Sequence, residues 1–431
     1  MSLPAPHNIR ANISLQDAVR EAEDGFIAAN PESRSAWQEA CTAMPGGNTR
    51  TVLYFDPFPL TLVRGEDAVV HDADGHAYLD FLGEYTCGLL GHSNAIVKAA
   101  LEKKLQNGIN MGGPGIHDAA FAQALCNRFA SLDRVRFCNS GTEANLLALN
   151  SARAWTGRDL IIVFEGGYHG SGLSFPKGGS NFALPFETLV CPYNDADAAR
   201  ALIAQNKDKL AAVLIEPMLG SGGCIPADVD FLKLLQSEAK ACGALFILDE
   251  VMTSRLSPGG LQQKLGLDPD LTTLGKYLGG GMSFGAFGGR AEIMDRFDPG
   301  QANAWMHAGT FNNNVLTMAA GLAAVTEVLT DDALNRVNAL GDQLRDRLNE
   351  VADDAGAPVH VSGIGSLMAI HFENQDPDLL KLLQFDLIAA GVYLPRRGMI
   401  VLSLPMTETD IGDLVDAFAE FVESRAGLLA A

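Results

Sequence analysis

Residues 244–251 read ALFILDEV, five apolar side chains in a row followed by Asp249 and Glu250. A half-exposed strand alternates apolar and polar side chains, whereas a strand of a parallel sheet is covered on both faces and is apolar throughout. The stretch therefore predicts a buried strand. In α/β sheets ligands bind beyond the carboxyl ends of the strands, so the acids that follow this strand are candidate site residues.

Similar apolar runs lie outward from this stretch, between about residues 85 and 330. They are Arg134–Cys138, Leu160–Phe164, Thr188–Cys191 and Ala211–Ile215, beside Ala244–Leu248 itself. Helical stretches lie between them, for example Thr142–Ala154 and Val229–Cys242. Strands that alternate with helices are typical of an α/β domain with a mostly parallel sheet.

Both ends of the chain follow other patterns. Residues 17–44 predict one helix, which ends at a Pro-Gly-Gly sequence, and residues 60–81 alternate like paired strands around an Asp-Gly turn. The last hundred residues predict a smaller mixed domain. It has a long amphipathic helix (Asp332–Ala352), two strands (Leu367–Phe372 and Met399–Leu404) and a closing helix from Thr409. We therefore expect an N-terminal segment (1–84), a large domain (85–330) and a C-terminal small domain (331–431).

The chain is acidic. Its 431 residues hold 31 Lys and Arg against 52 Asp and Glu, a net charge of −21. Such a surface repels phosphate backbones and anionic lipids, so we expect no nucleic-acid and no membrane partner. The opening residues 1–26 contain no apolar core of a signal peptide, and the chain contains no run of about 18 apolar residues that could span a bilayer.

The cysteines and histidines point to a reducing compartment and away from metal binding. The seven cysteines are scattered and never spaced as C-x-x-C, which is typical of free thiols. The nine histidines show no H-E-x-x-H or similar spacing, so we expect no metal site. These features predict a soluble cytoplasmic protein.

Lys276 lies in the glycine-rich stretch LTTLGKYLGGGMSFGAFGGR, residues 271–290. Glycines let backbone pack closely around a buried amine, and desolvation or nearby cations lower the pKa of a lysine and make it nucleophilic toward an aldehyde. A surface lysine before a flexible loop is the alternative, and it fits this segment equally well when the segment is taken alone.

Asp249 lies 27 residues before Lys276. Pyridoxal phosphate (PLP) is an aldehyde cofactor that needs a carboxylate on its pyridinium nitrogen, because the protonated ring withdraws electrons from the reacting substrate. An acid at the end of a buried strand suits this role. The alternative is an ordinary cap of a helix or loop.

Two further segments also follow predicted strands. Asn139–Ala144, NSGTEA, opens a helix, and N–H groups and hydroxyls at a helix N-terminus bind phosphate well. An ordinary helix cap explains the same residues. Phe164–Gly170, FEGGYHG, offers an aromatic ring at a strand end that could stack on a pyridine ring or belong to the core.

In order and spacing these segments resemble the class III (fold-type I) PLP-dependent aminotransferases. Within that class the chain resembles the branch that holds glutamate-1-semialdehyde aminomutases and β-phenylalanine (β-amino acid) aminotransferases. The matching stretches are NSGTEAN, FEGGYHG, IEPM, DEVMTSR, TLGKYLGGGMSFGAFGGR and GTFNNN, which run across nearly the whole chain. The resemblance implies a large domain with a mostly parallel sheet flanked by helices, and a smaller α/β domain built from the N- and C-terminal segments.

The resemblance also implies roles for individual residues. Lys276 would hold PLP as a Schiff base and shuttle the proton, and Asp249 would pair with the pyridinium nitrogen. The phosphate would be held by Ser140, Gly141 and Thr142. Tyr168 would stack on the ring with His169 beside it, and Glu216 and Met252 would lie near the cofactor.

One implied role concerns a second subunit. Thr310 matches the family threonine that reaches the phosphate of the neighbouring subunit's cofactor, so a homodimer with shared active sites is expected. Ser254 departs from the pattern, because many members of the class have glycine there. We expect this departure to leave the chemistry intact.

Three residues bear on the substrate. Arg50 follows PGGNT, the motif whose arginine binds the substrate carboxylate in both branches, and a guanidinium fork binds a carboxylate with two hydrogen bonds. A surface loop arginine is the alternative. Arg397, in LPRRGMIVLSLP, matches the arginine that binds the keto-acid acceptor in β-amino acid aminotransferases, which aminomutases generally lack. Tyr85, in EYT, also resembles the transaminases.

The resemblance therefore favours an aminotransferase that moves the amino group of a β-amino acid, with an aromatic or aliphatic side chain, to 2-oxoglutarate or pyruvate. The main alternative is a glutamate-1-semialdehyde 2,1-aminomutase. A third hypothesis is a PLP-fold protein that has lost catalysis and serves as a binding module. Retention of Lys276, Asp249 and the phosphate loop argues against the third.

Overall fold

The computed structural model of the protein describes residues 14–429. The expectation of no signal peptide falls partly on residues 1–13, which lie outside the described part. Within the described residues no helix is long and apolar enough to cross a membrane. The chain forms two compact units. The smaller comprises the described residues up to Tyr85, Gly91–Ser93 and those from Val337 on; the larger comprises Thr86–Leu90 and Asn94–Arg336.

Gly91–Ser93, expected in the large domain, therefore belongs with the smaller unit. Two side-chain contacts explain this. His92 Nε2 lies 2.8 Å from Asp80 Oδ2, and the Ser93 hydroxyl donates to Asp67 Oδ1 at 2.7 Å. Both contacts join the short segment to residues of the smaller unit that precede it in the chain.

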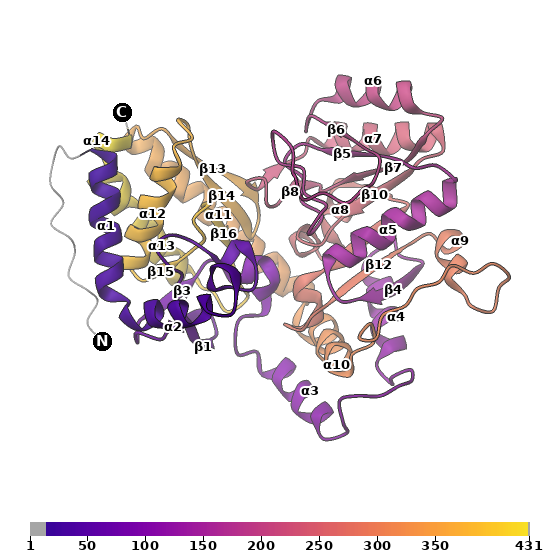
Figure 1. Ribbon diagram of the computed structural model, residues 1–431, viewed down its shortest axis with the longest axis horizontal. Helices are drawn as coiled ribbons and strands as arrows, with labels where there is room; N and C mark the ends of the chain where they lie inside the picture. Colours follow the sequence, from indigo (N-terminus) through magenta and orange to yellow (C-terminus); the bar gives the residue numbers. More distant parts are fainter. Residues whose placement is uncertain (1–13, 430–431) are drawn as a thin grey trace. The chain divides into compact units, whose positions relative to one another are not determined.

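A seven-stranded sheet with the order β4-β12-β11-β10-β7-β5-β6 forms the centre of the larger unit (Figure 1). The strands are β4 (Arg134–Cys138), β5 (Leu160–Phe164), β6 (Thr188–Cys191), β7 (Leu210–Ile215), β10 (Leu245–Asp249), β11 (Leu271–Gly275) and β12 (Gly285–Gly289). The apolar runs of the sequence give these strands to within one residue, except β11 and β12, which were not predicted. β12 runs antiparallel to both of its neighbours, and the other strands of this sheet share one direction.

Helices cover both faces of this sheet. Alternate side chains of β5, β7 and β10 pack on α5 (Gly141–Thr156) on one face, and the others pack on α6 (Ala196–Asn206) and α7 (Val229–Cys242) on the opposite face. The larger unit also contains the α-helices and strands α3 (Ala95–Leu105), α4 (Asp118–Arg128), β8 (Met218–Leu219), β9 (Ile225–Pro226), α8 (Gly260–Leu265), α9 (Ala291–Met294) and α10 (Val315–Ala323). Every side chain of β5, β7 and β10 is buried, as a sheet covered on both faces requires.

The N-terminal helix predicted over 17–44 is wrong in one respect, because the chain forms two helices. They are α1 (Leu15–Ala29) and α2 (Pro31–Cys41). Pro31 has no N–H to continue the helix and disfavours helical geometry at Asn30. The Asn30 side chain instead donates to the carbonyl of Phe26 at 2.7 Å, which closes the end of α1.

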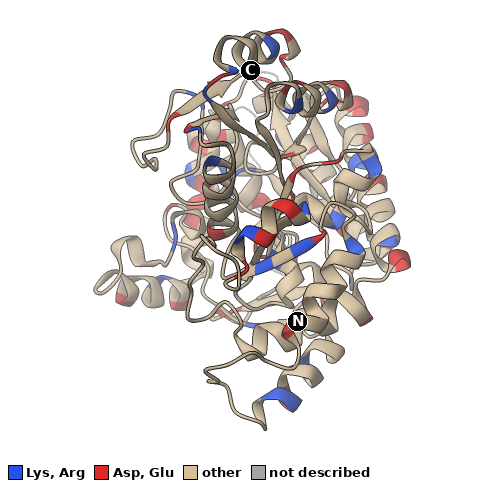
Figure 2. Cartoon of the chain, turned by 90° about the vertical axis from the view of Figure 1, so that its right-hand side faces the viewer, with Lys and Arg blue, Asp and Glu red and all other residues tan. Residues whose placement is uncertain are grey.

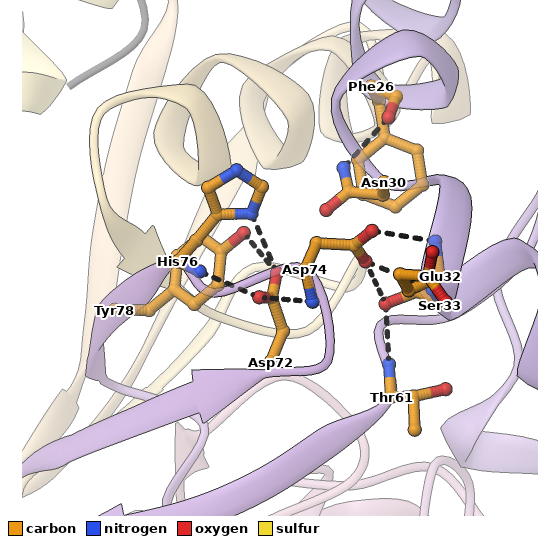
Figure 3. Close-up of polar contacts among 9 residues, drawn as sticks. All are labelled: Phe26, Asn30, Glu32, Ser33, Thr61, Asp72, Asp74, His76 and Tyr78. Atoms are coloured by element: carbon orange, nitrogen blue, oxygen red, sulfur yellow. Dashed lines mark hydrogen bonds and ion pairs between the residues drawn. The ribbon is translucent and has the colours of Figure 1, made fainter. Parts of the chain in front are cut away.

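The start of α2 is capped from a distant turn (Figure 3). The hairpin of β2 (Val69–Asp72) and β3 (Ala77–Asp80) carries Asp74 at its turn. One carboxylate oxygen of Asp74 accepts the N–H of Glu32 at 2.7 Å, and the other accepts the N–H of Ser33 at 3.0 Å and its hydroxyl at 2.7 Å. Asp74 thereby satisfies N–H groups that every helix leaves without a partner in its first turn.

The strands of the smaller unit form two sheets. One has the order β1-β2-β3-β15, with β1 at Leu62–Glu66 and β15 at Val392–Tyr393. The other has the order β13-β14-β16, at Val359–Ile364, Leu367–Phe372 and Met399–Val401. The helices of the C-terminal part are α11 (Asp331–Ala355), α12 (Pro377–Ala389), α13 (Glu408–Ser424) and α14 (Ala426–Leu429).

The last predicted strand, Met399–Leu404, is wrong at its end. The observed strand stops at Val401, because only the residues up to that position pair with β14.

On the outer helices basic and acidic residues are intermingled, as Figure 2 shows on the face in view.

Candidate active site

The candidate residues of the larger unit follow the carboxyl ends of its strands. β10 ends at Asp249, β11 ends just before Lys276, and β4 ends two residues before Ser140. β10 and β11 are parallel, and β4 shares their direction because β12 runs antiparallel to both β11 and β4. Parallel strands end at one edge of a sheet, so these segments meet there.

Lys276 has an unusual backbone conformation. Its φ is +55°, in the left-handed region that residues other than glycine rarely adopt. The preceding Gly275 is packed so closely that a Cβ would lie 3.2 Å from Val251 Cγ1 and 3.5 Å from the backbone nitrogen of Gly141. Strain of this kind concentrates at functional sites, and close packing of the neighbouring backbone maintains it here.

Asp249 is buried and surrounded by hydrogen-bond donors. Its Oδ2 atom accepts the side-chain amide of Asn145 at 2.7 Å and lies 2.8 Å from His169 Nδ1. Its Oδ1 atom accepts the backbone N–H of Val251 at 3.0 Å. Only 3% of the Asp249 surface is exposed, so the carboxylate relies on these donors in place of water.

The start of α5 carries the residues expected to hold a phosphate. The Ser140 hydroxyl accepts the N–H of Glu143 at 3.1 Å and caps the helix. Thr142 Oγ1 accepts the N–H of Ser171 at 3.2 Å. At Gly141 a Cβ would lie 2.8 Å from Val251 Cγ1, so only glycine fits without a shift. A 16-residue helix with this opening suits an anion.

Glu216 is a second buried acid near Asp249. Its carboxylate accepts the N–H of Tyr168 at 2.9 Å and the N–H of Gly220 at 3.1 Å. Burial raises the pKa of Glu216 to about 7, with a further contribution from the negative charge of Asp249 and an opposing one from His169. Met252 packs closely against Gly220, where a Cβ would lie 2.1 Å from the Met252 sulfur.

Tyr168 and Thr310 are more open. Tyr168 is 45% exposed, whereas the neighbouring His169 is buried. Thr310 lies exposed in a turn between α9 and α10. The structure thus brings Asp249, His169 and Glu216 into one network with the segment of Tyr168, and leaves Thr310 facing solvent in this single chain.

These residues fit PLP. Lys276 supplies an amine, buried Asp249 supplies an acceptor for a ring N–H, and the opening of α5 supplies N–H groups and hydroxyls for a phosphate. The exposed ring of Tyr168 offers a face for stacking.

The smaller unit holds the other candidates, gathered around Tyr85. The guanidinium carbon of Arg50 lies 5.7 Å from the Tyr85 ring centroid, and that of Arg397 lies 4.9 Å from it. Arg50 also pairs with Glu84, which sequence reasoning did not single out. Glu84 and Tyr85 both have positive φ, at 47° and 50°, so a strained turn presents this pair of side chains.

Arg396 and Arg397 differ in their surroundings. Arg396 donates to Gln384 Oε1 at 2.9 Å and to the carbonyl of Asp56 at 2.8 Å. Its guanidinium lies between the rings of Phe55 and Phe385, at 5.4 and 5.3 Å. Arg396 therefore has a structural role, since it joins separate segments of the smaller unit. Arg397, not Arg396, lies over Tyr85.

The family model of Aminotransferase class-III matches residues 54–422. The chain belongs to the class-III aminotransferase family. It is accordingly a PLP-dependent transaminase of fold type I, as the resemblance in its sequence implied.

Relatives of this class-III aminotransferase align over nearly its whole length. It is 47% identical to β-phenylalanine transaminase of Variovorax paradoxus, over 96% of this chain and 98% of that protein. The crystal structure of a β-phenylalanine aminotransferase from the same organism superposes with a TM-score of 0.95 and covers 96% of this chain and 99% of that one. A glutamate-1-semialdehyde 2,1-aminomutase of Methanosarcina acetivorans is 34% identical, over 90% of this chain and 98% of that protein.

Proposed function

We propose that this class-III aminotransferase moves the amino group of a β-amino acid, with an aromatic or aliphatic side chain, to 2-oxoglutarate or pyruvate. The observation that carries the proposal is its similarity to β-phenylalanine transaminase, at 47% identity and a TM-score of 0.95. The presence of two arginines beside Tyr85 supports it, because a transaminase must bind two different acids in turn.

In this proposal the Lys276 amine would hold the cofactor and would accept and return the proton of the donor carbon. Asp249 keeps the ring nitrogen protonated, helped by burial and by its two side-chain neighbours. When bound, PLP supplies a ring that withdraws electrons from the substrate. The strained backbone of Lys276 supports this role, because such strain is concentrated at active sites.

The remaining cofactor contacts divide between phosphate and ring. Ser140, Gly141 and Thr142 hold the phosphate at the start of α5, where the helix dipole favours an anion. Tyr168 would stack on the ring. Exposed Thr310 would reach the phosphate of a partner subunit's cofactor, so we expect a homodimer with shared active sites.

Arg50 and Arg397 bind the carboxylates of the substrates. Arg50 anchors the β-amino acid, and Arg397 anchors the keto acid; both guanidinium groups lie near the ring of Tyr85. A guanidinium suits a carboxylate because two parallel hydrogen bonds form. We further propose that the enzyme acts in the cytoplasm on small molecules, without a nucleic-acid or membrane partner.

A screen of amino donors tests the proposal. Purified holoenzyme is incubated with β-phenylalanine, an aliphatic β-amino acid and an α-amino acid, each with 2-oxoglutarate and with pyruvate, and the amino acid formed from the acceptor is measured. The proposal expects turnover of a β-amino acid with at least one acceptor. Turnover of α-amino acids alone would contradict it.

The aminomutase is the second candidate, favoured by relatives of that name at 34% identity. It predicts turnover of glutamate-1-semialdehyde with no acceptor present. A β-amino acid aminotransferase gives no such reaction, so this assay separates the two candidates.

A further inference from the structure

A buried amide on α5 contacts the carboxylate proposed to face the cofactor ring. Asn145 Nδ2 donates to Asp249 Oδ2 at 2.7 Å and to the backbone carbonyl of His169 at 3.1 Å. Only 1% of Asn145 and 2% of His169 are exposed, so water does not compete for these bonds. A hydrogen bond to a charged group is about twice as strong as one between neutral groups, and more so where water is excluded.

Thr273 fixes the direction of this amide. Its hydroxyl donates to Asn145 Oδ1 at 2.8 Å, and Thr273 is fully buried. If the amide were turned over, its oxygen would face two other acceptors, the carboxylate of Asp249 and the carbonyl of His169. Only the observed orientation gives the amide oxygen a donor, the hydroxyl of Thr273, and gives the amide N–H groups their two acceptors, Asp249 and the carbonyl of His169.

The three residues join the elements that carry the site. Asp249 and Thr273 are register partners on the neighbouring strands β10 and β11. Thr273 precedes Lys276 by three residues, and Asn145 lies one turn into the helix that Ser140 opens. A single chain of hydrogen bonds thus connects the lysine strand, the acid and the phosphate helix.

We propose that Asn145 is a positioning residue, which Thr273 orients and which holds the Asp249 carboxylate in place as the acceptor for the protonated ring nitrogen. Asn145 donates a hydrogen bond without bringing a second charge into the network. This matters because the network already contains His169 and the carboxyl of Glu216, both buried beside Asp249. The proposal rests on PLP binding, but not on the substrate class.

The test measures the protonation of the ring nitrogen directly. Wild type, Asn145→Ala, Thr273→Val and Thr273→Ser are reconstituted with PLP labelled with ¹⁵N in the ring, and the ¹⁵N resonance, the cofactor dissociation constant and the apoprotein Tm are measured without substrate. Ser151→Ala is the matched control, because Ser151 is also buried on α5 and its hydroxyl donates only to the carbonyl of Leu147.

In Asn145→Ala the resonance should move toward the unprotonated value, and cofactor binding should weaken about tenfold or more, the equivalent of losing a hydrogen bond to a charged group. Thr273→Val should change both in the same direction by less. Thr273→Ser, which keeps the hydroxyl, and Ser151→Ala should resemble wild type.

Two results would overturn the proposal. One is a folded Asn145→Ala protein with the wild-type resonance and affinity. The other is an equal shift in Ser151→Ala, which would mean that any loss of packing on α5 has this effect. If Asn145→Ala does not fold, the contrast between Thr273→Val and Thr273→Ser decides, and equal values for those two would count against it. No substrate is used, so a failure of the β-amino acid assignment leaves these readouts unaffected.

Discussion

The guanidinium of Arg397 lies over the ring of Tyr85, 4.9 Å from its centroid, while the neighbouring Arg396 is held by Gln384 and the carbonyl of Asp56. Stacking on a tyrosine ring fixes the plane of a guanidinium, and a guanidinium of fixed plane suits the flat carboxylate group. The stacking therefore supports a role for Arg397 in binding an acid.

Arg397→Ala should raise KM for the keto-acid acceptor about ten- to a hundredfold, because a charge-assisted pair contributes about 1.5–3 kcal/mol. The KM for the β-amino acid should change little, whereas Arg50→Ala should show the opposite pattern. Steady-state kinetics with donor and acceptor varied separately measure both. Arg64→Ala, which removes an exposed arginine paired only with nearby Glu66, is the control. Equal effects of Arg397→Ala on both substrates would exclude the division of roles.

Lys276→Ala should abolish turnover, because the cofactor would lose the amine that holds it. The fold should remain unchanged. Protein incubated with PLP, reduced with borohydride and weighed by mass spectrometry should carry the cofactor in the wild type and lack it in the variant. Circular dichroism reports the fold. A stoichiometric adduct in Lys276→Ala would move the attachment site to another lysine.

Asp249→Asn should lower kcat by about a hundredfold or more while PLP stays bound, because a neutral amide no longer stabilises the ring proton. Each factor of ten corresponds to about 1.4 kcal/mol of barrier. The measurement is kcat at saturating substrates together with the bound cofactor per chain. Asp197→Asn, at an exposed position on α6, is the control and should match wild type. A fully active Asp249→Asn would show that another group holds the proton.

Asp74→Ala should destabilise the start of α2. Three hydrogen bonds to Glu32 and Ser33 are lost, and the loss of a helix cap costs about 1–2 kcal/mol. Urea unfolding should show a lower midpoint than Glu39→Ala, which removes an exposed carboxylate from the same helix. Equal midpoints for the two variants would mean that the cap contributes nothing measurable.

His92 should make stability depend on pH. Its hydrogen bond with Asp80 raises the pKa of His92 above the usual 6.5, against the effect of burial. The folded form thus holds the proton more tightly than the unfolded chain, so this stabilisation is complete below pH 6.5 and is lost as the pH rises through the folded pKa. The difference in unfolding midpoint between wild type and His92→Gln should therefore shrink from pH 6 to pH 9. A difference that stays constant would refute the linkage.

The sequence predicts the other strands of the central sheet well, but neither β11 nor β12. Gly285–Gly289, GAFGG, has a composition that disfavours strands, yet the glycines are required there. A Cβ would lie 2.1 Å from the carbonyl oxygen of Ser140 at Gly285 and 2.1 Å from that of Asp270 at Gly289. Close approach of backbone to backbone selects these residues, and this contact is not visible in local sequence.

The candidate site was predictable where its residues follow strands. Asp249 and Ser140 follow apolar runs within two residues, and both make hydrogen bonds in the structure. Asn145 was quoted in a motif but given no role, because its partners lie 104 and 128 residues away. Glu84 was missed for a different reason. Its pairing with Arg50 depends on the positive φ of Glu84, and a positive φ is predictable from sequence mainly where the residue is glycine.

The smaller unit is assembled from both ends of the chain, and this bears on the order of events at the ribosome. β3 pairs with β15, where Leu79 is the register partner of Val392, and Phe26 packs on Phe385 with ring centroids 5.2 Å apart. During synthesis the N-terminal helices and hairpin must therefore wait for about 300 residues before their partners emerge. The larger unit is complete by then. A nascent chain halted after α10 would hold a complete seven-stranded sheet together with an N-terminal segment whose apolar side chains still lack their C-terminal partners, and exposed apolar surface of this kind favours aggregation.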